Sequence, residues 1–427
     1  MDHSSIDPRG AIAARDAFPV KTWLIAFAGW MFDFYDLVLF SYLLLPIGHE
    51  LALSETQEAW LLGVALGASG IGGILFGYLA DIHGRKKVMM WTICLYSAGT
   101  ALTAFAMGPR TLLLFRLITG LGVGGEWAVG HALLAESSPA RMRGRASALL
   151  QAGEPVGVAL AAVIGLLVAP LIGWRTVFLL SSASAAVAIV VRRHLPESPL
   201  WERQREARLS PAAALRRVAA AGLLVTMLKG FILGVCKLGT YWTCYTWLPK
   251  FLQKQMGQPV GRSALWIASA QAGQLLGMMA FGVIADRRGR RAAFTGYSLL
   301  TAAAIYALAF HWQWLLARPA LFWAALFTMG LGSGCTAGFG ALLAELFPTD
   351  VRNFTMGTVY NSARGVQLFA PVVVSFFVMR GGLTGGLSVP MVLALLTASW
   401  VWTLPETRLC DLASIRRGTP RKDDAHA

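Results

Sequence analysis

The chain has 427 residues, of which 56% are hydrophobic and only 14% are charged, and its formal net charge is +15. Soluble domains carry nearer a quarter charged residues, so this composition excludes an ordinary soluble protein and places most of the chain in lipid. The first 19 residues are polar and contain no apolar core. The sequence therefore predicts no cleavable signal peptide and a first membrane segment that is retained.

Apolar stretches of helical length predict an all-α membrane protein. An even number of spans also predicts that both termini lie on one side. Twelve such stretches follow one another along the chain, at 20–47, 58–80, 87–107, 111–135, 145–170, 174–192, 220–250, 264–285, 292–310, 315–344, 353–378 and 384–404.

The basic residues are distributed unevenly between the two sides of these spans. With the tails and the loops after each even-numbered span on one side, that side holds 26 of the 37 Lys and Arg, and the opposite side holds seven. This bias predicts that the basic side, with both termini, is cytoplasmic in a cell inner (plasma) membrane. The positive net charge is therefore attributed to the orientation of the chain in the membrane, and no nucleic-acid partner is expected.

The chain repeats itself. GYLADIHGRKKV at 77–88 returns as GVIADRRGRRAA at 282–293, LLAESSP at 133–139 as LLAELFP at 342–348, and LPES at 195–198 as LPET at 404–407. Internal repeats of this size in a membrane protein indicate a transporter built from two related halves. The predicted units are a cytoplasmic N-tail (1–19), a six-helix half (20–192), a cytoplasmic linker (193–219), a second six-helix half (220–405) and a cytoplasmic C-tail (406–427). The linker is expected to contain a short amphipathic helix at 200–217.

Four acidic residues lie inside predicted spans and away from their ends, where ionisable groups are costly and usually face a pathway. Asp33 and Asp36 stand three residues apart on one helix face, and two neighbouring carboxylates cannot both ionise cheaply. Glu126 is central in the fourth span, and Glu154 precedes Pro155, which is expected to bend the fifth. All four are candidates for proton coupling; structural pairing with neighbouring helices is the alternative.

Three cations inside spans are candidates for binding an anion. Arg364 aligns with Glu154 in the other repeat to within one residue, so it is expected to bind a carboxylate or to pair with Glu154 or Asp33. Lys237 is expected to be a second anion contact or the partner of the two aspartates. Arg116 is expected to bind substrate or to extend to the outer interface.

Polar and aromatic side chains complete the expected cavity. The cysteines and the intramembrane histidine do not indicate a further site. The predicted cavity residues are Asn361, Gln367, Gln271, Gln274, Tyr241 and Tyr245. The five cysteines show no metal-ligand spacing, so neither a zinc site nor a disulfide framework is expected. His131 is assigned no role.

The twice-repeated GYLADIHGRKKV pattern resembles the loop 2–3 signature of the major facilitator superfamily. The resemblance implies two pseudo-symmetric six-helix halves, and charge networks at the cytoplasmic side that break when the transporter opens inward. The residues expected in this conformational gate are Gly77, Asp81, Gly84, Arg85, Asp286, Gly289, Arg290 and Arg143.

Three further strings resemble the metabolite:proton symporters of that superfamily: GWMFDFYDLVLF at 29–40, RLITGLGVGGEW at 116–127 and LPESPLW at 195–201. The Asp-x-x-Asp pair also resembles the aromatic-acid and sialate symporters, although Phe34 stands where they have glycine. GEPVG does not match the helix-five motif of the drug/proton antiporters, which disfavours export.

Together these observations predict a proton-coupled symporter that imports a small carboxylate-bearing metabolite by alternating access. The expected protein is a monomer in the bilayer that binds substrate and proton, uses no cofactor or metal, and is not an enzyme. A uniporter, a proton antiporter that exports or facilitates a sugar-like or amphiphilic solute, and a transport-inactive membrane sensor remain as alternatives.

Overall fold

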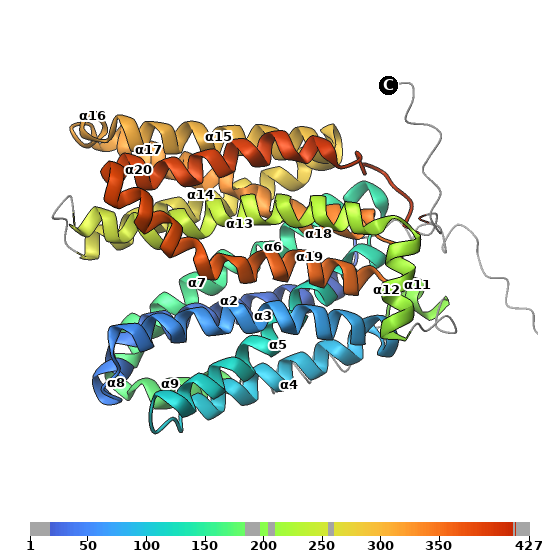
Figure 1. Ribbon diagram of the computed structural model, residues 1–427, viewed down its shortest axis with the longest axis horizontal. Helices are drawn as coiled ribbons and strands as arrows, with labels where there is room; N and C mark the ends of the chain where they lie inside the picture. The colour runs from blue at the N-terminus through green and yellow to red at the C-terminus, as the bar shows by residue number, and fades with distance from the viewer. Residues whose placement is uncertain (1–17, 184–196, 204–209, 255–259, 413–414, 416–427) are drawn as a thin grey trace, which may run out of the picture.

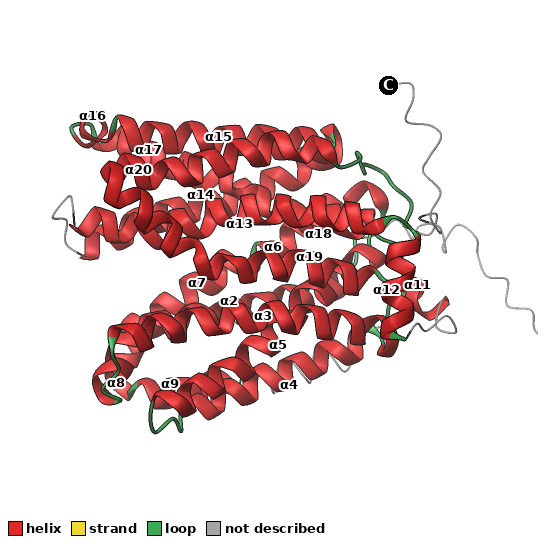
Figure 2. Ribbon diagram, in the orientation of Figure 1, coloured by secondary structure: helices red, strands yellow, loops and turns green. Residues whose placement is uncertain are grey.

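The computed structural model describes residues 18–183, 197–203, 210–254, 260–412 and 415, and every regular element in that part of the chain is a helix (Figures 1 and 2). Most of the predicted N-tail, the end of the sixth predicted span, much of the linker and most of the C-tail lie outside the described residues, as does the side chain of Tyr245.

The first half contains the helices from α2 to α9. Ser54 begins α3 with a capping box that it forms with Gln57, and Gly84, at a φ of 101°, turns the chain directly from α3 into α4. The bounds are α2 (Val20–Glu50), α3 (Glu55–His83), α4 (Arg85–Thr103), α5 (Pro109–Ser137), η1 (Ala140–Met142), α6 (Arg143–Gln151), α7 (Gly153–Val163), the π-helical turn η2 (Ile164–Val168), α8 (Ala169–Ile172) and α9 (Trp174–Ser182).

The second half repeats this plan after two short helices, α11 (Pro199–Arg203) and α12 (Pro211–Ala220). Gly289, at a φ of 96°, makes the turn equivalent to Gly84. The bounds are α13 (Leu223–Lys254), α14 (Val260–Arg288), α15 (Arg290–Phe310), α16 (Trp312–Leu316), α17 (Pro319–Ser333), η3 (Gly334–Gly338), α18 (Phe339–Leu346), α19 (Arg352–Val366), η4 (Gln367–Phe369), α20 (Ala370–Trp400) and η5 (Val401–Thr403).

Within the described residues, nine helical segments are long and apolar enough to cross a membrane, or ten if a bent pair around residue 370 counts as one span. Two of the twelve predicted stretches, 87–107 and 174–192, are not among them. α4 begins with three basic residues, and the described part of α9 has nine residues. The two last predicted spans form α19 and α20, and α20 bends at Gly381 and Gly382.

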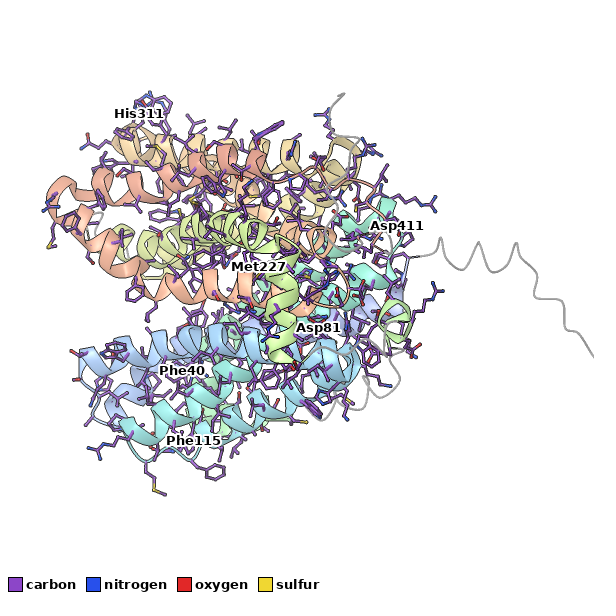
Figure 3. The ribbon with its side chains drawn as sticks, turned by 45° about the vertical axis from the view of Figure 1, so that its right-hand side comes forward. Phe40, Asp81, Phe115, Met227, His311 and Asp411 are labelled. Carbon is purple, nitrogen blue, oxygen red and sulfur yellow. The ribbon has the colours of Figure 1, made fainter. Side chains whose placement is uncertain are left out.

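The two halves lie side by side, with α2 to α5 in the lower part of Figure 1, α13 to α17 in the upper part, and α6, α18 and α19 between them where the halves meet. α3 packs against α5 in the first half as α14 packs against α17 in the second, and the halves meet where α3 contacts α19 and α14 contacts α6. We call the end of the bundle that carries α11 and α12 the linker end. Figure 3 places Asp81 near it and His311 at the opposite end.

Candidate functional site

A buried arginine lies between the two halves. Arg364, on α19, is 1% exposed, and its guanidinium carbon lies 5.8 Å from the ring centre of Trp30 and 5.2 Å from that of Phe34, both on α2. Its charge interacts with Asp33, Glu154, Tyr241 and Tyr360. Among the described residues, neither of its terminal nitrogens has a hydrogen-bond partner. A buried cation with unused donors in a planar fork is suited to a carboxylate.

Glu154 lies where the fifth span breaks. The helix is interrupted near the predicted bend: α6 ends at Gln151 and α7 begins at Gly153, two residues before Pro155. The Glu154 carboxylate accepts a hydrogen bond of 2.8 Å from Gln151 Nε2 and one of 3.1 Å from Gln274 Nε2, which belongs to the other half. The Oε1 atoms of Gln271 and Gln274 are buried without a partner among the described residues.

The two aspartates of α2 have different surroundings. Asp36 accepts a hydrogen bond of 2.6 Å from Thr100 Oγ1 and one of 3.2 Å from Arg116 Nη1, so it forms an ion pair inside the first half. Arg116 is 1% exposed and stacks over Phe40 rather than extending to an interface. Asp33 is fully buried and instead interacts electrostatically with Arg364.

The other predicted site residues lie at several places around this centre. Asn361 donates to Gly124 O across the halves at 2.8 Å, and Gln367 donates to Ala363 O at 2.8 Å. Glu126 accepts from Thr92 at 3.1 Å inside the first half. Lys237 is 1% exposed, and within the described ranges no ion pair includes it. Those ranges also contain no group of three His, Cys, Asp or Glu arranged for a metal.

A charge cluster occupies the linker end of the first half. Arg85 contacts Asp81 at 3.4 Å and Glu136 at 3.1 Å, and Ser198 also donates to Glu136. Glu197 accepts the backbone N–H of Arg85 at 3.0 Å and that of Lys86 at 3.1 Å. Burial raises the pKa of Glu197, while these N–H groups and the Arg85 charge oppose the shift.

The second half contains the same cluster. Arg290 contacts Asp286 at 3.1 Å and Glu345 at 2.8 Å, and Thr407 donates to Glu345 at 2.6 Å. Glu406 accepts the backbone N–H of Arg290 at 2.8 Å, as Glu197 does for Arg85. Each half thus places one arginine between an aspartate and a glutamate, and caps the following helix with a second glutamate.

The two clusters are joined across the halves. Asp81 accepts the backbone N–H of Asn353 at 3.2 Å and that of Phe354 at 2.9 Å. Asp286 accepts the N–H of Gly144 at 2.8 Å and that of Arg145 at 3.0 Å. Two further pairs cross between the halves, Arg352 with Glu136 at 2.5 Å and Arg143 with Glu345 at 4.0 Å.

Several of these residues were not among the predicted site residues. Glu136, Glu345, Glu197 and Glu406 stand inside the repeated LLAE, LPES and LPET strings, so the repeat already contained the information that could have identified them. Trp30, Gln151 and Tyr360 had no such pattern, because their place at the centre depends on how the helices are rotated.

Known proteins resemble this chain over most of its length. The family model for the Major Facilitator Superfamily matches residues 23–272. A putative metabolite transport protein of Haemophilus influenzae is 35% identical over 82% of this chain and 87% of its own length. A probable 4-methylmuconolactone transporter of Cupriavidus pinatubonensis is 31% identical, covering 91% of each chain, and the sialic acid transporter NanX of Escherichia coli is 30% identical over 83% of this chain and 86% of its own.

The fold is also similar to that of a solved transporter structure. The solved structure of the proton:xylose symporter XylE superposes with a TM-score of 0.78 over 93% of this chain and 98% of that one, at 20% identity. The predicted architecture of two pseudo-symmetric halves is therefore confirmed. The chain belongs to the Major Facilitator Superfamily, and it is a secondary transporter rather than an enzyme.

Proposed function

We propose that this protein imports a small organic anion together with a proton, by alternating access across the inner membrane. The observation that carries the proposal is Arg364, a buried guanidinium whose terminal nitrogens have no hydrogen-bond partner among the described residues. A buried charge is expensive unless it is paired, so the site is best completed by a ligand that brings a carboxylate.

The surroundings of Arg364 favour a small acid. Trp30 and Phe34 flank the guanidinium, and Gln271, Gln274 and Tyr241 are the proposed polar contacts for the rest of the ligand. Lys237, Asn361 and Gln367 are proposed to line the same space. Two relatives, a sialic acid transporter and a probable 4-methylmuconolactone transporter, are named for cargoes that are in keeping with this substrate class.

Proton coupling is assigned to the acids of the first half. Asp36 is buried and paired with Arg116, and protonation of the carboxylate removes the attraction that holds the pair. Asp33 and Glu154 interact with Arg364, so the charge of the anion site depends on their protonation. Binding of a proton and a monoanion together leaves the net charge of the site unchanged, whereas either one alone changes it, so joint binding favours movement of one half over the other.

The linker end is proposed to be the cytoplasmic gate. Both charge clusters lie there, together with four of the interhalf contacts described above: those of Asp81 and Asp286 with helix starts, and the pairs Arg352–Glu136 and Arg143–Glu345. This arrangement corresponds to a transporter closed at that side. With the linker and both tails assigned to the cytoplasm, substrate enters from the opposite, outer side. Opening inward then requires that Asp81 and Asp286 release the helices that they hold.

The test is uptake by proteoliposomes that contain the purified full-length protein. Monocarboxylates, dicarboxylates, aromatic acids, sialic acid, amino acids and sugars are first compared by the thermal stabilisation that each gives. The best ligand is then supplied with and without an inward proton gradient, and internal pH is recorded. We expect accumulation against the ligand gradient and internal acidification.

The variants in this assay separate the two roles. Asp36→Asn is expected to abolish proton-driven accumulation and to leave exchange of ligand between the two sides. Arg364→Ala is expected to abolish both. Accumulation without any proton movement would overturn the symport proposal and favour uniport, whereas proton movement opposite to that of the ligand would favour an antiporter.

A further inference from the structure

A chain of hydrogen bonds runs from the central site to the contact between the halves. Gln151 donates to Glu154 at 2.8 Å, and its Oε1 atom lies 3.1 Å from Trp127 Nε1 and 3.1 Å from His131 Nε2. On its other side, His131 Nδ1 lies 3.4 Å from Ser147 Oγ. Trp127, His131, Ser147, Gln151 and Glu154 are all buried.

Trp127 fixes the direction of this chain. An indole N–H only donates, so Gln151 must present its oxygen to Trp127 and its NH₂ group to Glu154. His131 Nε2 shares the same oxygen, so it must carry a hydrogen. In the neutral imidazole, Nδ1 is then an acceptor that points toward Ser147.

Ser147 has one hydroxyl hydrogen and two acceptors for it. In this arrangement Ser147 Oγ lies 2.6 Å from the carbonyl oxygen of Ala337 in the other half and receives the N–H of Ala341 at 3.2 Å. The hydrogen therefore points across the halves. When the halves part, both of these partners leave, and His131 Nδ1 is the acceptor that remains within the same half.

The two halves are also in close contact at the same histidine. A Cβ atom placed on Gly340 would lie 1.9 Å from His131 Nδ1, so the ring rests directly on the backbone of the other half. Trp127 also stacks on Tyr360 of the other half, with ring centres 3.6 Å apart and planes at 5°. Any movement of the halves at this level changes the surroundings of His131.

We propose that His131 is a positioning residue that couples Glu154 to the contact between the halves. Ser147 gives its hydrogen to Ala337 when the halves are together and to His131 when they part. A change at Glu154 moves the Gln151 amide, and with it the hydrogen bond that orients the imidazole. The inference rests on the proposed role of Glu154 in the central site, but its test does not depend on transport.

The test measures how the halves respond to a change at Glu154, using the full-length protein in nanodiscs. Spin labels are placed at Lys87 and Ala292, which are exposed, equivalent positions at the linker end, with Cys94 and Cys410 replaced by serine. Distance distributions give the ratio of closed to open linker ends. Four proteins are compared: unchanged, Glu154→Gln, His131→Leu and the double variant.

With His131 present, Glu154→Gln is expected to change the ratio of the two populations by about fivefold or more, a usual size for coupling between sites. In the His131→Leu background the change is expected to fall to less than about twofold. His131→Gln, whose amide can donate to Gln151 and accept from Ser147, is expected to restore it. His311→Leu, at the far end, is the matched control and leaves the response unchanged.

Equal responses to Glu154→Gln with and without His131 would overturn the proposal, as would the absence of any response in the unchanged background. If His131→Leu does not fold, Ser147→Ala breaks the chain one step later and is expected to have the same effect. Its control is Ser69→Ala, since Ser69 Oγ donates to Leu66 O in its own helix and has no other hydrogen bond in the part of the chain that the structure describes. A failed symport assay with an intact response would refute the proposed function and leave this coupling standing.

Discussion

Asp81 and Asp286 occupy equivalent positions in the two repeats, and each carboxylate accepts backbone N–H groups from the first turn of a helix in the opposite half. Asp81 holds the start of α19, and Asp286 holds the start of α6. The first turn of a helix has N–H groups without intrahelical partners, and its dipole favours a negative charge there. The linker end is therefore held closed at two equivalent places, each by an aspartate that binds the start of a helix in the opposite half.

Replacement of either aspartate is expected to open the linker end. Asp81→Asn or Asp286→Asn removes the charge from these hydrogen bonds, which costs about 1 kcal/mol, or roughly fivefold in population. The distance between labels at Lys87 and Ala292 measures the effect, and the double variant is expected to open further. Asp350→Asn, which affects a partly exposed pair with Arg217, is the control. A closed linker end in the double variant would contradict this explanation.

A methyl group at Gly77 is expected to have the same consequence by a steric route. A Cβ atom there would lie 2.5 Å from the Asn353 carbonyl oxygen, which is backbone and cannot turn aside, whereas a Cβ atom at Gly67 in the same helix meets nothing within 4 Å. Gly77→Ala should destabilise the closed linker end by about 1–3 kcal/mol, and Gly67→Ala should not. The same label pair reports both; equal effects would exclude the contact as the cause.

The Asp36–Arg116 pair makes a prediction about stability. Asp36→Asn leaves a buried guanidinium without its counter-charge, which is expected to lower the free energy of unfolding by about 3 kcal/mol. Removing the cation as well, with Arg116→Gln, should recover most of that loss. Thermal unfolding of the purified variants provides the comparison. If the double variant were less stable than Asp36→Asn alone, unpaired charge would not be the reason.

Arg364→Lys separates charge from shape at the central site. Lysine keeps the positive charge but loses the planar fork and the stacking between Trp30 and Phe34. The dissociation constant of the acid that stabilises the protein most in the ligand panel should rise about tenfold, equivalent to about 1.4 kcal/mol. Titration calorimetry measures it. Unchanged affinity would mean that only the charge matters, and affinity lost for neutral ligands as well would point to a general collapse of the site.

The sequence was most informative where it repeats. The duplicated GYLADIHGRKKV string identified both aspartates and both arginines of the linker end, because a repeat gives equivalent residues equivalent neighbours. Pro155 next to Glu154 predicted a bend, and the helix is interrupted between α6 and α7, since proline removes a backbone donor wherever it stands. These conclusions need only local geometry.

The sequence was least informative about which helix faces which. Asp33 and Asp36 were expected to form one titrating pair, and their spacing places them near each other on α2. Their partners nevertheless differ, because Thr100 and Arg116 reach Asp36 from α4 and α5, while Arg364 lies on the side of Asp33. The rotation of three helices decides this, and hydropathy does not fix rotation.

His131 and Gly340 are counterparts in the repeated strings HALLAE and GALLAE, and they touch. Two equivalent positions meet only on the axis that relates the halves. In a dimer of identical chains both partners at that point would be the same, and two imidazoles cannot share the space that one ring fills against a bare backbone. A single polypeptide that contains both halves is free of that restriction. The two equivalent positions on the axis can therefore hold different residues, here a histidine and a glycine.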